Sequence, residues 1–161
     1  MPSLRRSGRR IIKEHVWEEP AVKITGEVEK IMEERFGRDN VIALATVEGD
    51  MPCVRYVNAF YEQGAFYVIT YGLSNKMRQL EKNPQAAIAG DWFTARGRGR
   101  DLGYWGEAGN AETADKLRQA FSAWIDDGHN DFQDENTRIL QIRLENGVLF
   151  SNGTRYDIDF T

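Results

Sequence analysis

The chain has few of the residues that carry out chemistry by themselves. Its 161 residues include one cysteine, Cys53, and two histidines, His15 and His129. A single cysteine excludes an intrachain disulfide and any CxxC metal or redox motif. The sequence also lacks HExxH, P-loop and GxSxG motifs. If the protein catalyses a reaction, a bound cofactor must therefore supply the reactive group, and no catalytic residue is assigned.

Long apolar segments are also absent. No run approaches the roughly 20 apolar residues of a membrane-spanning helix, and the N-terminal segment has no apolar signal core. We therefore expect a cytoplasmic protein without a membrane partner. With 41% hydrophobic and 29% charged residues, the composition is ordinary for a soluble globular protein of one domain.

Carboxylates are concentrated in one segment of the second half of the chain. They are Asp126, Asp127, Asp131, Asp134 and Glu135. Their spacing does not match a calcium-binding loop, which needs glycine at its sixth position and glutamate at its twelfth. We interpret the segment as a solvated acidic loop and predict no metal site.

Positive charge is concentrated at the N-terminus, although the net charge is −4. Five basic residues precede the first acidic residue, Glu14; they are Arg5, Arg6, Arg9, Arg10 and Lys13. We predict a basic arm over residues 1–20 and a single domain over residues 21–161. The arm could contact nucleic acid or anionic lipid. A frayed tail, or packing on an acidic neighbouring subunit, explains it better, because no nucleic-acid recognition motif is present. We expect no nucleic-acid partner.

Residues 41–90 contain the clearest pattern of secondary structure. Strands are predicted over 41–47, 53–60 and 65–70, with turns at 48–50 and 62–64. The first run is mostly apolar on both faces, so we expect a central strand, whereas the residues of 53–60 alternate between two faces. A helix is predicted over 75–82, because Ser74 is a good N-cap and Asn83-Pro84 stops a helix. Further predictions are helices over 26–36 and 111–126 (capped by Asn110), a strand over 86–93, a hairpin over 97–109, and turns at Asn146-Gly147 and Asn152-Gly153. The expected fold is mainly β with flanking helices.

Two basic side chains stand out within this segment. Arg55 is the one charge in an otherwise apolar stripe of its strand, so it needs an anionic partner. Lys76 lies in the first turn of the 75–82 helix, where the helix dipole disfavours a cation. A bound phosphate would remove that conflict, although a solvated lysine on a short surface helix explains it equally well. A three-stranded meander would bring Arg55 close to residues 70–76, as a phosphate-bearing cofactor requires.

An ordered series of segments resembles a known family. These segments are ALATV, a turn with Pro52, CVRYVNAFY, FYVIT and SNKMRQLEKNP. From about residue 27 to the C-terminus the chain is similar to the FMN-binding split β-barrel proteins related to pyridoxamine 5'-phosphate oxidase. The resemblance implies an antiparallel split β-barrel.

The resemblance also implies roles for particular residues. The family's second-strand Arg and the Lys of its Ser-x-Lys motif hold the FMN phosphate, and they match Arg55 and Lys76. Ser74 and Asn75 would add hydroxyl and main-chain donors. The flavin ring and ribityl chain would lie near Tyr56, Val57, Asn58, Ile69, Thr70 and Tyr71. In a regular strand Arg55 and Asn58 point to opposite faces, so both touch one ligand only if the strand twists or the ligand spans an edge.

The implied activity is that of an FMN-dependent oxidoreductase. Because the C-terminus lacks a convincing match to the Arg and Trp of the true oxidase, a reductase of an unknown small molecule using NAD(P)H is the preferred reading. The family implies a homodimer with flavin at the interface, and Trp92, Tyr104 and Trp105 are candidates to reach the partner's flavin. The alternatives are FAD, deazaflavin or haem as cofactor, a flavin- or haem-binding protein without turnover, and a nucleic-acid-binding module.

Overall fold

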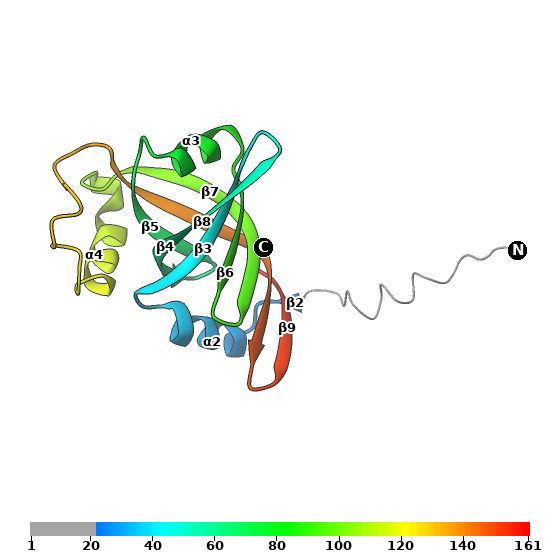
Figure 1. Ribbon diagram of the computed structural model, residues 1–161. Helices are drawn as coiled ribbons and strands as arrows, with labels where there is room; N and C mark the ends of the chain where they lie inside the picture. Colours follow the sequence, from blue (N-terminus) through cyan, green and yellow to red (C-terminus); the bar gives the residue numbers. More distant parts are fainter. Residues whose placement is uncertain (1–21) are drawn as a thin grey trace, which may run out of the picture.

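A computed structural model describes residues 22–161 (Figure 1). The predicted basic arm over 1–20, and His15 within it, lie outside these residues. The strands are β2 (Val22–Lys23), β3 (Asn40–Glu48), β4 (Met51–Glu62), β5 (Ala65–Tyr71), β6 (Gln85–Gly90), β7 (Phe93–Tyr104), β8 (Thr137–Ser151) and β9 (Thr154–Asp159). The helices are α2 (Gly26–Phe36), α3 (Asn75–Lys82), α4 (Ala111–Ala120) and a short 3-10 helix at Ala108–Asn110.

Six of the strands close into an antiparallel barrel. Around the barrel the order is β8, β5, β4, β3, β6 and β7, and β7 pairs again with β8. Strand β9 extends the sheet from β8, and β2 pairs with β9 in parallel. Figure 1 shows α3 at the upper end of the barrel, α2 at the lower end and α4 at its left side. This arrangement confirms the predicted split β-barrel.

The barrel is open along part of one strand pair. Strand β4 pairs with β3 from Met51 to Ala59, but it pairs with β5 only from Phe60 to Glu62. Strand β5 instead pairs with β8 along its whole length. Before Phe60, β4 is therefore separated from β5, and we call this opening between the two strands the split.

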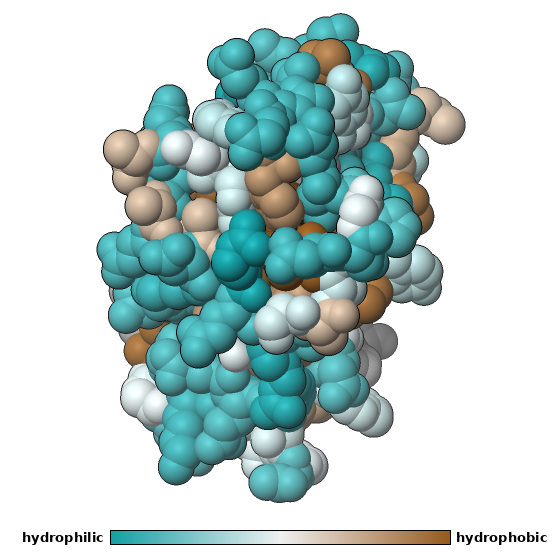
Figure 2. Space-filling model, turned by 90° about the vertical axis from the view of Figure 1, so that its left-hand side faces the viewer, coloured by the Kyte–Doolittle hydropathy of each residue, from teal (hydrophilic) through white to brown (hydrophobic). Residues whose placement is uncertain are grey.

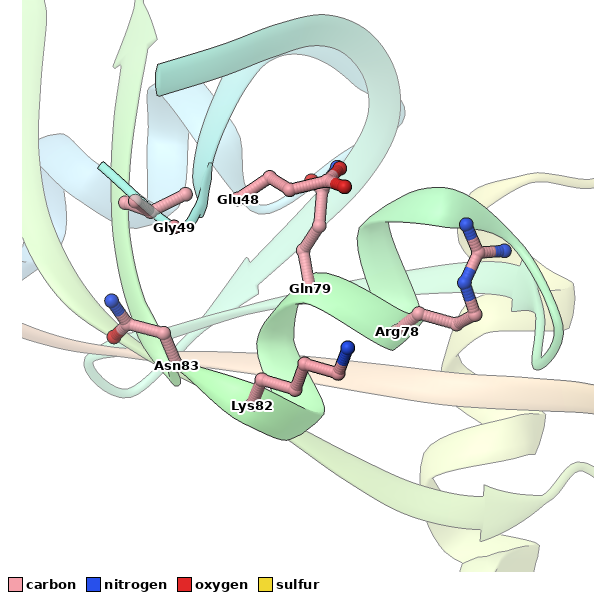
Figure 3. A pocket seen from close by; sticks show the side chains of 7 residues that line it. Glu48, Gly49, Arg78, Gln79, Lys82 and Asn83 are labelled. Atoms are coloured by element: carbon pink, nitrogen blue, oxygen red, sulfur yellow. The ribbon is translucent and has the colours of Figure 1, made fainter. Parts of the chain in front are cut away.

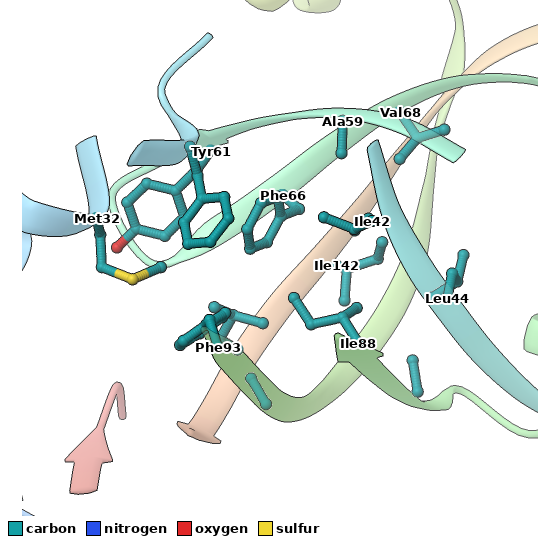
Figure 4. Packing of buried hydrophobic residues seen from close by; sticks show 14 of the residues in the cluster. Met32, Ile42, Leu44, Ala59, Tyr61, Phe66, Val68, Ile88, Phe93 and Ile142 are labelled. Carbon is teal, nitrogen blue, oxygen red and sulfur yellow. The ribbon is translucent and has the colours of Figure 1, made fainter. Parts of the chain in front are cut away.

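Two apolar clusters hold the fold together. The larger fills the barrel, and Figure 4 shows Phe66 among side chains from several strands. The Phe66 ring lies 5.6 Å from that of Phe36 on α2 and 5.4 Å from that of Tyr61, centroid to centroid. The smaller cluster includes Leu117 and Phe121 and joins α4 and the segment after it to Ile139 on β8. This packing places the segment after α4 close to the split.

Two helices begin and end where the sequence predicts. Helix α2 starts after Thr25, whose Oγ1 accepts a hydrogen bond from the Val28 amide at 3.3 Å, and it ends at Gly37. Helix α3 spans 75–82, and Asn83 follows it. No helix within residues 22–161 is long and apolar enough to cross a membrane.

The prediction of a hairpin over 97–109 was wrong. Residues 93–104 form one continuous strand, β7, whose Gly97 and Gly99 face inward. A Cβ on Gly97 would lie 2.2 Å from the Arg143 carbonyl oxygen, and one on Gly99 would lie 2.8 Å from Leu80 Cδ1. These glycines therefore permit close packing and do not form a turn.

The predicted turn at Asn146-Gly147 was wrong for the same reason. Both residues lie inside β8, and a Cβ on Gly147 would lie 2.9 Å from the Thr94 carbonyl oxygen. The chain turns at Asn152-Gly153, as predicted, where φ is 51° and 79°. The strand predicted over 86–93 also divides, because Trp92 turns the chain between β6 and β7 with φ of 51°.

The helix predicted over 111–126 is shorter than expected. Helix α4 ends at Ala120, and the following residues continue in turns with Phe121 and Ile125 in the smaller cluster. Asn110 does not cap the helix with its side chain. Its Nδ2 donates instead to the carbonyl oxygens of Leu102 at 3.1 Å and Tyr104 at 2.8 Å. The buried amide thus satisfies carbonyl groups near the end of β7.

Candidate functional site

Arg55 points inward from β4, at the end of the barrel that α3 covers. Its Nη1 donates to the Leu44 carbonyl oxygen at 3.1 Å and to Thr46 Oγ1 at 2.7 Å, and its Nη2 donates to Gln79 Oε1 at 3.1 Å. All three acceptors are neutral. Within residues 22–161, no ion pair involves Arg55. Arg55 thus faces the interior, as expected from its stripe, and its role in holding an anion stays a prediction.

Gln79 on α3 holds this network in place. Its Oε1 also accepts from Thr46 Oγ1 at 2.5 Å, and its Nε2 donates to Glu48 Oε1 at 3.0 Å. Because both ends of the amide are bonded, the direction in which Gln79 presents its oxygen is set. Sequence reasoning missed Gln79. The available signal was its spacing, since residues three apart share one face of a helix and Lys76 is three positions earlier.

Lys76 lies in the first turn of α3 near Arg55. Burial, and secondly repulsion from Arg55, lower the pKa of Lys76 below its ordinary value. Lys76 makes no ion pair with any residue between 22 and 161. Two neighbouring cations without a carboxylate are unfavourable unless an anion joins them. The geometry is that of an anion site.

Two buried hydroxyls next to α3 in the sequence have no partner within the described residues. They are Thr70 Oγ1, in a residue only 6% exposed, and Ser74 Oγ. Ser74 occupies the N-cap position, but its side chain accepts no hydrogen bond from the first turn, so the predicted cap was wrong. The Ser74 hydroxyl is buried and leaves the first-turn amides of α3 to another acceptor. Unsatisfied buried hydroxyls of this kind fit a site that a polar ligand completes.

A cleft of about 380 Å³ lies in the split beside these groups. Its walls come from β4 and β5, from Lys76, and from the segment after α4. The lining residues are Val57, Asn58, Val68, Ile69, Lys76, Trp124, Asp127, His129 and Asn130. Because β4 has no partner on this edge, Val57 and Asn58 border one cavity although they belong to opposite faces of the strand. The open edge thus resolves the difficulty of placing Asn58 and the inward-facing Arg55 beside one ligand.

Polar contacts fix the rim of the cleft. The carboxylate of Asp39 accepts from Asn58 Nδ2 at 3.0 Å and from Trp124 Nε1 at 2.8 Å, and so joins β4 to the segment after α4. His129 Nδ1 lies 2.7 Å from Asp127 Oδ1, and this contact lowers the pKa of Asp127. Among these rim residues, Asn58 was predicted from the sequence as a site residue, whereas Asp39, Trp124, Asp127 and His129 were not. Their convergence depends on contacts between distant segments.

Three further predicted site residues, Tyr56, Tyr71 and Asn75, do not line the cleft. Tyr56 is 80% exposed on the outer face of β4, and Tyr71 is exposed at the end of β5. Asn75 Oδ1 accepts from Arg78 Nη2 at 2.5 Å. The structure therefore brings Val57, Asn58, Ile69 and Lys76 into one cavity and leaves Tyr56 facing away from the barrel.

The two predicted tryptophans lie elsewhere. Trp92 is 70% exposed in the turn between β6 and β7, with its ring 6.1 Å from that of Phe150. Trp105 is buried in the smaller cluster, 4.7 Å from the Phe132 ring. Neither lines the cleft of its own chain, and their contact with a partner's flavin stays a prediction.

A second hollow of about 350 Å³ lies along another side of α3. Figure 3 shows Arg78 and Lys82 projecting from the helix, with Glu48 and Gln79 close to each other. Both signs of charge line this hollow. In the part of the chain that the structure covers, no group of three or more His, Cys, Asp or Glu residues could hold a metal ion.

Comparisons with known proteins agree with this geometry. A sequence profile described as pyridoxamine 5'-phosphate oxidase matches residues 28–149. No curated protein sequence matches the chain.

Solved structures share the fold at low sequence identity. An FAD-binding protein from Mesorhizobium loti is 15% identical, with a TM-score of 0.59, over 77% of this chain and 92% of its own. The haem storage protein HutZ from Vibrio cholerae is 20% identical, with a TM-score of 0.56, over 77% and 92%. A NimC/NimA family protein from Clostridium acetobutylicum is 20% identical, with a TM-score of 0.57, over 80% and 92%. At these identities the likeness shows the fold, which other members use to bind different cofactors.

The charge of Lys76 predicts a pH-dependent effect on stability. Because the folded state lowers the pKa of Lys76, the protonated amine destabilises the fold at neutral pH. That penalty disappears as the pH rises past the ordinary value of 10.5, where the amine is neutral in both states. Lys76→Met should therefore raise the urea midpoint of the ligand-free protein at neutral pH, and the gain should shrink toward high pH. Lys82→Met, on the same helix, is the control and should give no gain. A Lys76→Met protein less stable than the wild type at neutral pH would contradict this account.

Proposed function

Because the chain belongs to the pyridoxamine 5'-phosphate oxidase family, we propose that it binds FMN in the split and acts as a flavin-dependent reductase of a small molecule. One observation carries the proposal. Arg55 and Lys76 lie together without a carboxylate partner among the described residues, next to α3, whose first-turn amides have no side-chain cap. This is the charge pattern that a phosphate monoester would complete.

Each part of the site has a role in this proposal. Arg55 and Lys76 would hold the phosphate, and Ser74 and the first-turn amides of α3 would add hydrogen bonds. Val57 and Ile69 would supply apolar walls for the ring, with Asn58 at the rim. When bound, FMN would supply the redox chemistry that the protein's own side chains lack. The protein's contribution is to bind, orient and shield the cofactor.

A specific observation favours haem binding as the second candidate function. His129 is the one histidine between residues 22 and 161, it borders the cleft, and its Nδ1 faces Asp127. Imidazoles that bind a metal through one nitrogen commonly contact a carboxylate through the other. Haem carboxylates could also pair with Arg55 and Lys76. In this alternative the protein would store or carry haem without turnover, as a protein of this fold from Vibrio cholerae is named for doing.

The first prediction of the proposal concerns cofactor affinity. Charge-assisted hydrogen bonds contribute about 1.5–3 kcal/mol each, and about 1.4 kcal/mol is a tenfold change in affinity. Lys76→Gln and Arg55→Gln should therefore each weaken FMN by about tenfold or more in a fluorescence-quenching titration. Lys82→Gln keeps the same helix and lies outside the cleft, so it should bind FMN as the wild type does. Equal affinities for wild type and Lys76→Gln would exclude this phosphate site.

The reductase part of the proposal predicts an electron donor. In the protein saturated with FMN, NADH or NADPH should bleach the flavin absorption band under anaerobic stopped-flow conditions. His129→Ala should leave this bleaching nearly intact, because the proposal gives His129 no part in it. If neither donor reduces the bound flavin, the protein is a carrier and not a reductase. If the purified protein instead shows a haem spectrum that His129→Ala abolishes, the second candidate function is correct.

The outer face of β3 and β4 supports a homodimer as the functional unit. Register pairs Ala45 with Val54 and Ala43 with Tyr56, so apolar side chains cover this part of the sheet. Val54 is 70% exposed and Tyr56 is 80% exposed. By contrast, the side of the molecule that carries α4 is predominantly hydrophilic (Figure 2). An exposed apolar face of this kind is typical of a subunit interface.

This face predicts the behaviour of a charged variant. The wild type should sediment as a dimer at micromolar concentration. Tyr56→Glu places a charge on the proposed interface, so it should shift the protein toward monomer and weaken FMN at the same time. Lys30→Glu on α2 is the control and should stay dimeric. A wild-type monomer with FMN bound would refute the shared site.

A further inference from the structure

A second cleft lies on the outer surface of β7 and β8, away from the split. Its volume is about 610 Å³, and none of its lining residues borders the split. Three of them are arginines, Arg98, Arg100 and Arg143, and the partly buried Phe160 supplies apolar surface. Cations and apolar side chains thus border one hollow of the size that small-molecule ligands occupy.

The strand register places like charges opposite each other. Arg98 on β7 pairs directly with Arg143 on β8, and Arg100 pairs with Gln141. Like charges at directly opposite positions destabilise a sheet, since the two side chains project from the same face. The sheet therefore carries a repulsion that a bound anion would convert into attraction.

None of the three arginines is neutralised by the described part of the protein. Glu145 and the last residue, Thr161, also border the cleft, but no ion pair within residues 22–161 involves Arg98, Arg100 or Arg143. Other arginines of the chain do have partners. Arg118 lies 3.1 Å from Asp126, and Arg138 lies 3.1 Å from Asp101. The chain has more acidic than basic residues, 25 against 21, so a shortage of carboxylates does not explain the unpaired cluster.

Packing does not explain the arginines either. The alternating glycines of β7, Gly97 and Gly99, face inward because a Cβ at either position would collide with its neighbours. Arg98 and Arg100 occupy the outward positions and are exposed. Any polar residue with good strand propensity could occupy these outward positions without disrupting the sheet. Arginines that repel one another are therefore better explained by a ligand than by the fold.

We propose that this cleft binds a phosphorylated small molecule with an apolar part. Guanidinium groups bind phosphate oxygens through two parallel hydrogen bonds, and three of them suit a ligand with more than one negative charge. Phe160 would contact the apolar part. The ligand is compact, because Phe160 borders the same hollow as the arginines. The proposal is independent of FMN binding, which concerns a different cavity.

The test uses the full chain, with any cofactor it retains, and isothermal titration with inorganic pyrophosphate and with ADP. Both probes should bind, and ADP should bind more tightly because its base adds apolar contact. Arg98→Gln and Arg143→Gln should each weaken binding by about tenfold or more, as expected for the loss of a charge-assisted contact. The titrations are run with FMN at saturation, so that the split is filled. Arg38→Gln on another surface is the control, and it should bind as the wild type does.

A stability measurement separates lost binding from lost folding. Without a probe, Arg143→Gln should melt no lower than the wild type, because it removes the repulsion from Arg98. ADP should raise the melting temperature of the wild type and leave that of Arg143→Gln unchanged.

Three results would overturn the proposal. The first is absence of binding by the wild type to both probes. The second is binding that Arg98→Gln and Arg143→Gln leave unchanged, which would locate the anion outside this cleft. The third is tighter binding of a short single-stranded DNA than of ADP, abolished by the same arginine variants. That result would make the cleft part of a nucleic-acid surface.

Discussion

From Met51 to Ala59, strand β4 is hydrogen-bonded to β3 but not to β5, which pairs with β8 instead. The candidate site depends on this separation. It exposes the edge of β4, so that Val57 and Asn58 border one cavity with Ile69 and Lys76. A barrel paired along this edge would have hydrogen bonds where the cleft now lies, and it could not receive a ligand there.

Helix α3 brings an unfavourable charge, that of Lys76, into the site. Helix α3 follows β5, and Gln79 on this helix bonds to Arg55 from β4 and to Thr46 from β3. This contact keeps the helix over the end of the barrel and with it brings Lys76 close to Arg55. The lowered pKa of Lys76 shows that the ligand-free protein is destabilised there. Such local destabilisation is common where a site is organised in advance for a charged ligand.

Strand β7 shows how one strand can serve packing and surface chemistry together. Its inward positions need glycine because the β8 backbone and the Leu80 side chain approach closely. Its outward positions are free of that requirement, and arginines occupy them. Because side chains alternate between the two faces of a strand, the inward face of β7 can meet the requirements of close packing while the outward face carries charged residues. The two cation-rich sites of the molecule share a chemistry, but they lie in different cavities.

Much of the fold was predictable from the sequence. The apolar runs over 41–47 and 65–70 located β3 and β5, the alternating faces of 53–60 located β4, and Asn83-Pro84 marked the end of α3. Arg55 was recognisable as a charge within an apolar stripe, because a strand repeats every two residues. These features depend on residues close together in the chain. The resemblance to a known family supplied the barrel topology.

Tertiary structure decided what local sequence could not. Asn146-Gly147 and the glycines of β7 have the composition of turns, but close contact between strands distant in sequence holds them extended. Ser74 has the chemistry of an N-cap, yet its hydroxyl is buried without a partner among the described residues. The rim formed by Asp39, Trp124 and His129 and the pairing of Arg98 with Arg143 join segments that no local pattern connects. Local periodicity therefore determined the strands and the principal cations, and only packing between remote segments determined which side chains share a cavity.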